Sequence, residues 1–307
     1  MKSLTILLMA SLSVFTSVLF AQPALVDVSN IKKKWLDIPY ANLSPAEKLD
    51  IYLPSEGDGL FPVIISIHGG AFMFGDKADE QLNPMLKGLN HGYAIVSINY
   101  RMSGEAIFPA NINDVKAAIR WVKANSVKYK FNLKRIALWG GSAGGNLAAL
   151  AGTSGDVKEL EDMSMGNANQ SSKVMAVVDW FGPTNFLLMD EQLKETGNGK
   201  PDNNEANSPL SKVLGQKITE IPAIVKMANP ESYITSDDPP FLIEHGTKDQ
   251  FVPTQQSVIF FGKLKKILGK EKVKLHLLEG VKHGGKEFET PENLQIVFSF
   301  LDKILKK

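Results

Sequence analysis

The chain of 307 residues is long enough for one large α/β domain, and its 44% of hydrophobic residues suffices for a sizeable core. The 34 Lys and Arg residues nearly balance the 33 Asp and Glu residues, which excludes the strong field that would attract nucleic acid or an anionic membrane surface. The absence of cysteine excludes disulfides and thiolate sites, and the five histidines form no H-E-x-x-H pair, so we expect no metal.

The first 21 residues predict a signal peptide. Lys2 supplies a positive charge, and an uncharged apolar run follows it as far as Phe20. Ala21 is a small residue at which cleavage is expected, although Leu19, at the third position before that cut, is larger than the usual pattern prefers. We therefore expect a secreted or periplasmic protein with no membrane contact beyond the export signal. An uncleaved membrane anchor is the alternative.

Residues 22–307 predict a single domain, because strand and helix signals alternate along them as in a mostly parallel sheet that helices cover on both faces. Short apolar or alternating runs predict strands at 49–53, 63–67, 93–100, 135–139, 174–180, 241–244 and 273–278. The alternation in the first of these indicates a half-exposed strand. Apolar residues at helical spacing predict helices at 112–122, 146–150, 255–268 and from 291 onward.

The segment 184–229 breaks this alternation. Its middle, residues 195–204, is polar and rich in glycine. An insertion at the C-terminal side of two strands would lie over an active site as a lid. An ordinary surface loop is the alternative.

A glycine-rich turn around Ser142 is the strongest chemical signal. The run Gly140–Gly145 (G-G-S-A-G-G) follows a predicted strand and precedes a predicted helix, the context in which G-x-S-x-G forms a nucleophile elbow. Such a turn raises the serine hydroxyl above the sheet, at the positive end of the helix. The spacing fits neither of the glycine-rich phosphate-binding motifs, and a purely structural turn is the alternative.

A serine nucleophile needs a base, and the base needs a carboxylate to orient it. In α/β-hydrolases these residues follow in the order serine, acid, histidine, and Asp249 and His283 each follow a predicted strand in that order. Because active sites of open parallel sheets lie at the C-terminal strand ends, both can converge on Ser142. Glu244 lies within its strand, and His245 is expected to fix the loop. A solvated loop histidine is the alternative for His283.

The oxyanion of a tetrahedral intermediate also needs hydrogen-bond donors. The run His68–Phe72 (H-G-G-A-F) ends an early strand and is similar to the H-G-G-G element that supplies a backbone N–H to such a site. We expect the N–H groups of Gly70, Ala71 and Ala143 to be the donors, with Gly69 as a further candidate. A plain glycine turn is the alternative.

Taken together, these motifs resemble the hormone-sensitive-lipase-like branch of bacterial α/β-hydrolase esterases, and most of all the secreted acetyl and feruloyl esterases of plant polysaccharide degradation. The resemblance spans about Leu49 to Leu301. It rests on Leu49–Pro54, His68–Phe72, Gly75–Lys77, Asn99–Arg101, Phe108–Ala110, Asp114, Gly140–Gly145, Gly182–Pro183, Asp238–Pro240 and the two partner loops. It implies an α/β-hydrolase fold, the triad Ser142, Asp249 and His283, and no cofactor. Ala71 replaces the third glycine of the usual motif, and Gly141 stands where this branch often has Asp or Glu.

The resulting hypothesis is a serine carboxylester hydrolase that cleaves short-chain or aromatic acyl esters, on a small molecule or on an oligosaccharide of plant origin. An exported serine peptidase or amidase with the same triad is the alternative. A non-catalytic binding protein is a third possibility, against which the intact order of the three residues argues. Phe72, Trp180 and Phe181 are expected in the acyl pocket, or else in core or rim packing.

Overall fold

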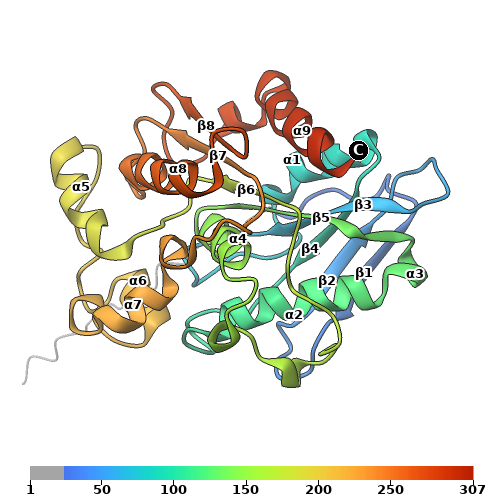
Figure 1. The fold of residues 1–307 in the computed structure, drawn as a ribbon, viewed down its shortest axis with the longest axis horizontal. Helices are drawn as coiled ribbons and strands as arrows, with labels where there is room; N and C mark the ends of the chain where they lie inside the picture. The colour runs from blue at the N-terminus through green and yellow to red at the C-terminus, as the bar shows by residue number, and fades with distance from the viewer. Residues whose placement is uncertain (1–23, 307) are drawn as a thin grey trace, which may run out of the picture.

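The computed structural model describes residues 24–306, so the predicted signal peptide of residues 1–21 lies outside the described part, and export stays a prediction. Within that part the chain forms one eight-stranded sheet with the order β1-β2-β4-β3-β5-β6-β7-β8 (Figure 1). The strands are β1 (Lys34–Pro39), β2 (Lys48–Tyr52), β3 (Phe61–Ile67), β4 (Ala94–Ile98), β5 (Phe131–Gly141), β6 (Ala176–Trp180), β7 (Phe241–Gly246) and β8 (Val273–Leu278). Among the strands described, β2 pairs antiparallel with β1 and with β4, and all other neighbouring strands pair parallel. The predicted mostly parallel sheet is therefore confirmed.

Helices cover both faces of this sheet, and a separate apolar core lies under each set. The helices are α1 (Asn83–Leu86), α2 (Ala110–Ala124), α3 (Ser126–Tyr129), α4 (Ala143–Thr153), α5 (Met189–Thr196), α6 (Pro209–Leu214), α7 (Pro222–Ala228), α8 (Gln255–Leu268) and α9 (Pro291–Leu305). Apolar residues of α2, α4 and α8 belong to one core, and those of α1 and α9 to the other. Between residues 24 and 306, no helix is both long and apolar enough to cross a bilayer.

The central strands place the candidate motifs at one edge of the sheet. β3 is buried on both faces, which explains why its sequence is a continuous β-branched run rather than an alternating one. Its Ile65 lies opposite Val96 of β4 and Leu138 of β5. Because Ile67 pairs with Gly140, the loop after β3 and the glycine turn after β5 begin side by side.

Two features of the first strands differ from the prediction. β1 was not predicted, since most of its residues are exposed and carry no apolar alternation. β2 is buried rather than half-exposed, because its polar Asp50 is paired inside the protein. The Asp50 carboxylate accepts the backbone N–H of Asp37 at 2.7 Å and lies 3.1 Å from the ammonium of Lys77, which comes from the loop after β3.

The insertion of residues 184–229 contains α5, α6 and α7, which lie together at the left of Figure 1. It is tied to the body of the domain at both its start and its polar middle. The N–H of Thr184 donates to Gln256 of α8 at 2.8 Å, and the Asn198 amide donates to the carbonyl of Thr247 at 3.4 Å. The insertion therefore lies beside the loops that follow β6 and β7.

A buried ion pair anchors the chain after β4. The Arg101 guanidinium donates to both carboxylate oxygens of Asp114 at 2.6 to 3.0 Å, and the backbone N–H of Arg101 donates to the same group at 2.7 Å. Glu47 lies 3.6 Å from this guanidinium and is also buried. Burial raises the pKa of Asp114 to about 6, although the hydrogen bonds from Arg101 act in the opposite direction.

We expect Arg101→Ala to lower the free energy of unfolding by about 3–5 kcal/mol at pH 8, because it leaves the Asp114 carboxylate buried without its partner. Without Arg101 the pKa of Asp114 rises above about 6, so the folded protein binds a proton that the unfolded chain releases. The loss should therefore be largest at high pH and shrink between pH 8 and pH 5. Urea unfolding at both pH values measures it. Lys173→Ala, which removes an exposed pair with Asp156, is the control and should cost less than about 1 kcal/mol.

Candidate active site

Ser142 lies on a sharp turn between β5 and α4, with φ 57° and ψ −121°. This left-handed backbone is strained for a residue with a side chain, and its persistence at one serine marks a functional constraint. The Ser142 N–H donates to the carbonyl of Trp180 on β6 at 2.9 Å. A Cβ at Gly144 would lie 2.0 Å from the carbonyl oxygen of Ile67, so only glycine allows α4 to approach β3 this closely.

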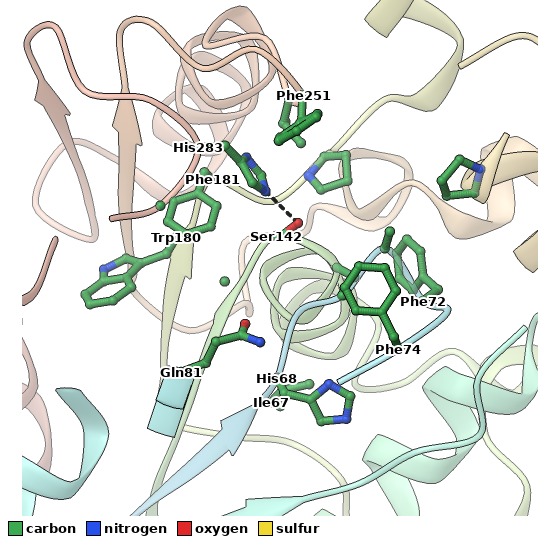
Figure 2. A pocket seen from close by; sticks show the side chains of 18 of the residues that line it. Ile67, His68, Phe72, Phe74, Gln81, Ser142, Trp180, Phe181, Phe251 and His283 are labelled. Atoms are coloured by element: carbon green, nitrogen blue, oxygen red, sulfur yellow. Dashed lines mark hydrogen bonds between the residues drawn. The ribbon is translucent and has the colours of Figure 1, made fainter. Parts of the chain in front are cut away.

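Ser142, His283 and Asp249 form a continuous hydrogen-bonded line, and Figure 2 shows the first of its two bonds. His283 Nε2 lies 2.9 Å from Ser142 Oγ, and His283 Nδ1 lies 2.7 Å from Asp249 Oδ2. A carboxylate can only accept, so the imidazole proton is placed on Nδ1 and Nε2 is left to accept the serine proton. The structure thus brings together the three residues that the sequence analysis singled out.

Asp249 is buried and accepts four N–H groups. Its Oδ1 accepts the backbone N–H groups of Phe251 at 2.8 Å and Val252 at 2.9 Å, and its Oδ2 accepts from His283 and from His245 at 3.1 Å. Burial raises the pKa of Asp249, but the hydrogen bonds from the two histidines outweigh burial, and the net shift of the pKa is downward. The carboxylate is therefore ionised at neutral pH.

His245 holds the acid loop rather than the serine. Its Nε2 donates to Asp249 and to the carbonyl of Val252 at 2.9 Å, and its Nδ1 accepts the hydroxyl of Ser257 at 2.6 Å. Glu244 instead accepts the amide of Asn293 at 2.8 Å, on the other side of β7. Both residues lie where the sequence analysis placed them, in roles apart from the serine.

The loop after β3 lines the same cavity as Ser142, with Gly70 and Ala71 among its lining residues. Gly70 has φ 107°, Ala71 has φ 54° and Phe72 has φ 60°, so three successive residues adopt the left-handed region. No hydrogen bond within residues 24–306 occupies the N–H groups of Gly70, Ala71 and Ala143. The N–H of Gly69 is not free, because it donates to Gln81 Oε1 at 2.9 Å. A role of Gly69 as a further oxyanion donor stays a prediction.

A cavity of about 930 Å³ surrounds the serine and extends toward both apolar cores. On one side its apolar walls are Phe72, Pro183, Met189, Leu210 and Val252, and on the other they are Leu82, Met85, Trp180, Phe181 and Phe288. The three aromatic residues predicted for the pocket therefore line it, and they also pack in the cores. The Phe181 ring meets the His283 ring edge to face at 4.8 Å, as its position in Figure 2 suggests.

Three further residues of this cavity were missed by sequence reasoning. Phe74 and Phe251 are 57% and 62% exposed, and Gln81 contacts the loop of donors. Phe251 follows Asp249 by two residues, so its position next to the predicted acid could have indicated it. Nothing in the sequence around Gln81 indicates that Gln81 lines the cavity. Among the residues described, no group of three or more His, Asp or Glu side chains is placed to hold a metal ion.

The fold and the arrangement of the three side chains define an α/β-hydrolase. The BD-FAE family model matches residues 49–264, and the chain belongs to that family. It is 33% identical over 233 residues to esterase LipQ of Mycobacterium tuberculosis and 31% identical over 239 residues to the probable carboxylic ester hydrolase LipM of the same organism. Each match covers 75% of this chain and 52% of the relative, so the chain spans about half the length of these curated relatives.

Solved structures show the same fold. A bifunctional GH43-CE protein of Bacteroides eggerthii has a TM-score of 0.79 at 36% identity, over 88% of this chain and 35% of its own. A truncated form of a carbohydrate esterase from gut microbiota has a TM-score of 0.81 at 32% identity, over 94% of this chain and 100% of its own. The resemblance drawn from the motifs is therefore confirmed at the level of family and fold.

We expect Asp249→Asn to lower the free energy of unfolding at pH 7 by about 1–3 kcal/mol, because the new amide N–H₂ faces two histidine donors. The pKa of Asp249 is lower in the folded protein than in the unfolded chain. Its carboxylate therefore contributes fully to the free energy of unfolding above about pH 4, and this contribution is lost as the pH falls below about 4. The difference between the two proteins should shrink from pH 7 to pH 3 in urea unfolding. Asp156→Asn, at an exposed carboxyl, should show no such trend. A difference that is constant with pH would contradict the ionised state of Asp249.

Proposed function

We propose that the protein is a serine carboxylester hydrolase. The observation that carries the proposal is the line Ser142–His283–Asp249, which ends at a serine in the cavity that Gly70, Ala71 and Ala143 also line; among residues 24–306 the N–H groups of these three have no hydrogen-bond partner. A nucleophile, a base with the right tautomer and preformed oxyanion donors are the parts that acyl transfer requires.

The geometry suggests one order of steps. Ser142 Oγ attacks the ester carbonyl while its proton passes to His283 Nε2, and the carbonyl electron pair moves onto oxygen. The N–H groups of Gly70, Ala71 and Ala143 are the donors for this oxyanion. When the intermediate collapses, the bond to the alcohol oxygen breaks, and His283 returns the proton to that oxygen. Water then attacks the acyl-enzyme with His283 as base, which releases the acid and restores the Ser142 hydroxyl.

The ester bond is the preferred target over the amide bond. The relatives LipQ and LipM are named an esterase and a probable carboxylic ester hydrolase, and one of the two solved structures is a truncated form of a carbohydrate esterase. Together with the site, these names support ester hydrolysis more than the exported peptidase or amidase. A binding protein without activity would have no use for a strained Ser142 and an imidazole at 2.9 Å from it.

We expect Ser142→Ala to reduce hydrolysis of p-nitrophenyl acetate by about 10⁴-fold or more, because no other group forms the acyl-enzyme. A colorimetric assay measures the rate, and an organophosphate should label the unmodified protein but not the variant. Ser55→Ala, at an exposed serine after β2, is the matched control and should keep full activity. Activity retained by Ser142→Ala would rule out the mechanism.

The substrate is proposed to carry its ester on a sugar. Phe74 and Phe251 are exposed beside the cavity, and neither exposed ring is needed for packing in a core. Large exposed apolar groups at a cavity mark binding surfaces, and an aromatic face suits the apolar C–H face of a pyranose ring. Asn198, Lys200 and Asn203 of the insertion line the same cavity and offer hydrogen bonds to sugar hydroxyls.

We expect Phe74→Ala to lower kcat/KM for an acetylated xylo-oligosaccharide by about 10-fold, as the loss of one aromatic contact of about 1–1.5 kcal/mol implies. The same variant should change kcat/KM for ethyl acetate, which has no sugar ring, by less than about 2-fold. Met163→Ala, at an exposed side chain outside the cavity, is the control for both substrates. An equal loss on both esters would show that Phe74 does not contact the sugar.

A further inference from the structure

Gln81 contacts the loop of oxyanion donors directly. It lies in the short 3-10 helix of residues 80–82, and its side chain lies below Ser142 in Figure 2, as does that of His68. Its Oε1 accepts the N–H of Gly69 at 2.9 Å, the residue immediately before the first proposed donor, Gly70. Gln81 is exposed to the cavity, so it is not a packing residue of a core.

Asp79 determines which way the Gln81 amide points. Gln81 Nε2 donates to Asp79 Oδ2 at 2.9 Å, and the backbone N–H of Gln81 donates to Asp79 Oδ1 at 3.0 Å. Asp79 is 1% exposed. Because a carboxylate oxygen can only accept, the NH₂ end of the amide must face Asp79 and the carbonyl end must face Gly69. The amide therefore presents an acceptor, and not a donor, to the loop.

Gly69 is held on both sides. While Gln81 accepts its N–H, its carbonyl oxygen accepts from His68 Nδ1 at 2.7 Å. That carbonyl belongs to the same peptide plane as the N–H of Gly70, and in a trans peptide the two point in opposite directions. A Cβ on Gly69 would lie 2.8 Å from both Gln81 Oε1 and the Gly141 carbonyl, so the three groups are closely packed. The two hydrogen bonds hold the peptide planes before and after Gly69, so together they fix the direction of the Gly70 N–H.

We propose that Gln81 is a positioning residue for the oxyanion site: by accepting the Gly69 N–H, it aims the Gly70 N–H at the developing negative charge, and Asp79 keeps its amide in the productive orientation. This inference rests on the proposed hydrolase function. It concerns preorganisation, in which a donor is useful only when it is already aimed before the charge forms. The interaction should therefore affect the chemical step and not the binding of the ground-state ester.

Gln81→Met tests the inference, since it keeps the length of the side chain but removes the acceptor. We expect kcat for p-nitrophenyl acetate to fall by about 10-fold, less than the roughly 10²–10³-fold that removing a donor costs, because the donor stays but is no longer aimed; KM should change by less than about 2-fold. The inhibition constant of n-butylboronic acid, whose adduct places an oxygen among the donors, should rise with the fall in kcat. The melting temperature should fall by no more than about a few degrees, because the Gly69 N–H and Asp79 each lose one partner, and the assays are run well below it. Gln295→Met, at an exposed glutamine on α9, is the matched control.

A double-mutant cycle tests the role of Asp79. Asp79→Asn keeps an acceptor for the Gln81 backbone but turns an NH₂ toward the Gln81 amide, so kcat should fall. In the Gln81→Met background the same change should have no further effect on kcat. Independent, multiplying effects would overturn the role assigned to Asp79. If Asp79→Asn does not fold, Gln81→Ala still tests Gln81 and should match Gln81→Met.

The outcomes separate this inference from the function on which it rests. A protein without Ser142-dependent esterase activity would overturn the proposed function. An active protein in which Gln81→Met keeps the kcat of the unmodified chain would overturn only the positioning role. A rise in KM without a fall in kcat would do the same, because Gln81 would then contact the bound ester.

Discussion

Three backbones meet at the end of β5, and their closeness is the constraint on which the site depends. The turn at Ser142 donates its N–H to Trp180 of β6, and α4 begins so near to β3 that Gly144 has no room for a side chain. The turn is thus fixed to both neighbouring strands. The loop after β3 carries the oxyanion donors, and Phe181 after β6 contacts His283. The register of the sheet therefore sets the distances between the serine turn, the loop after β3 and His283. The contacts of the sheet around Ser142 compensate for its strained backbone.

The pKa of each buried carboxyl at this edge of the sheet depends on how many hydrogen-bond donors contact it. Asp249 after β7 accepts four N–H groups, and its pKa is lowered despite burial. Asp179 of β6 is just as buried, but among residues 24–306 it accepts a single N–H, that of Gly182 at 2.9 Å, and burial raises its pKa to about 6. Two carboxyls on adjacent strands thus shift in opposite directions. Asp249 therefore keeps its charge to a lower pH than Asp179 does, and it is Asp249 that contacts the imidazole of His283.

Sequence reasoning succeeded where the chemistry follows from strand ends. Asp249 and His283 could be predicted because each follows an apolar run at the edge where parallel strands of one sheet meet their loops. The burial of β2 could not be predicted, because it depends on the pairing of Asp50 with Lys77, which lies 27 residues later in the chain. The contact between Gln81 and Gly69 could not be predicted either, because the two residues lie 12 positions apart and no motif connects them. Short helices such as α6 are stabilised by packing more than by helix propensity, and they are too short to show a repeated apolar spacing, so they could not be predicted.

The two walls of the cavity are held by the two cores of the domain. Trp180 and Phe288 belong to the core under α1 and α9, so a change there disturbs the packing of the sheet. Met189 and Leu210 come from α5 and α6 of the insertion and belong to the other core, which also contains Ala143 and Leu147 of α4. In the proposed hydrolase, a substitution on either side therefore changes the packing of the fold together with the shape of the cavity.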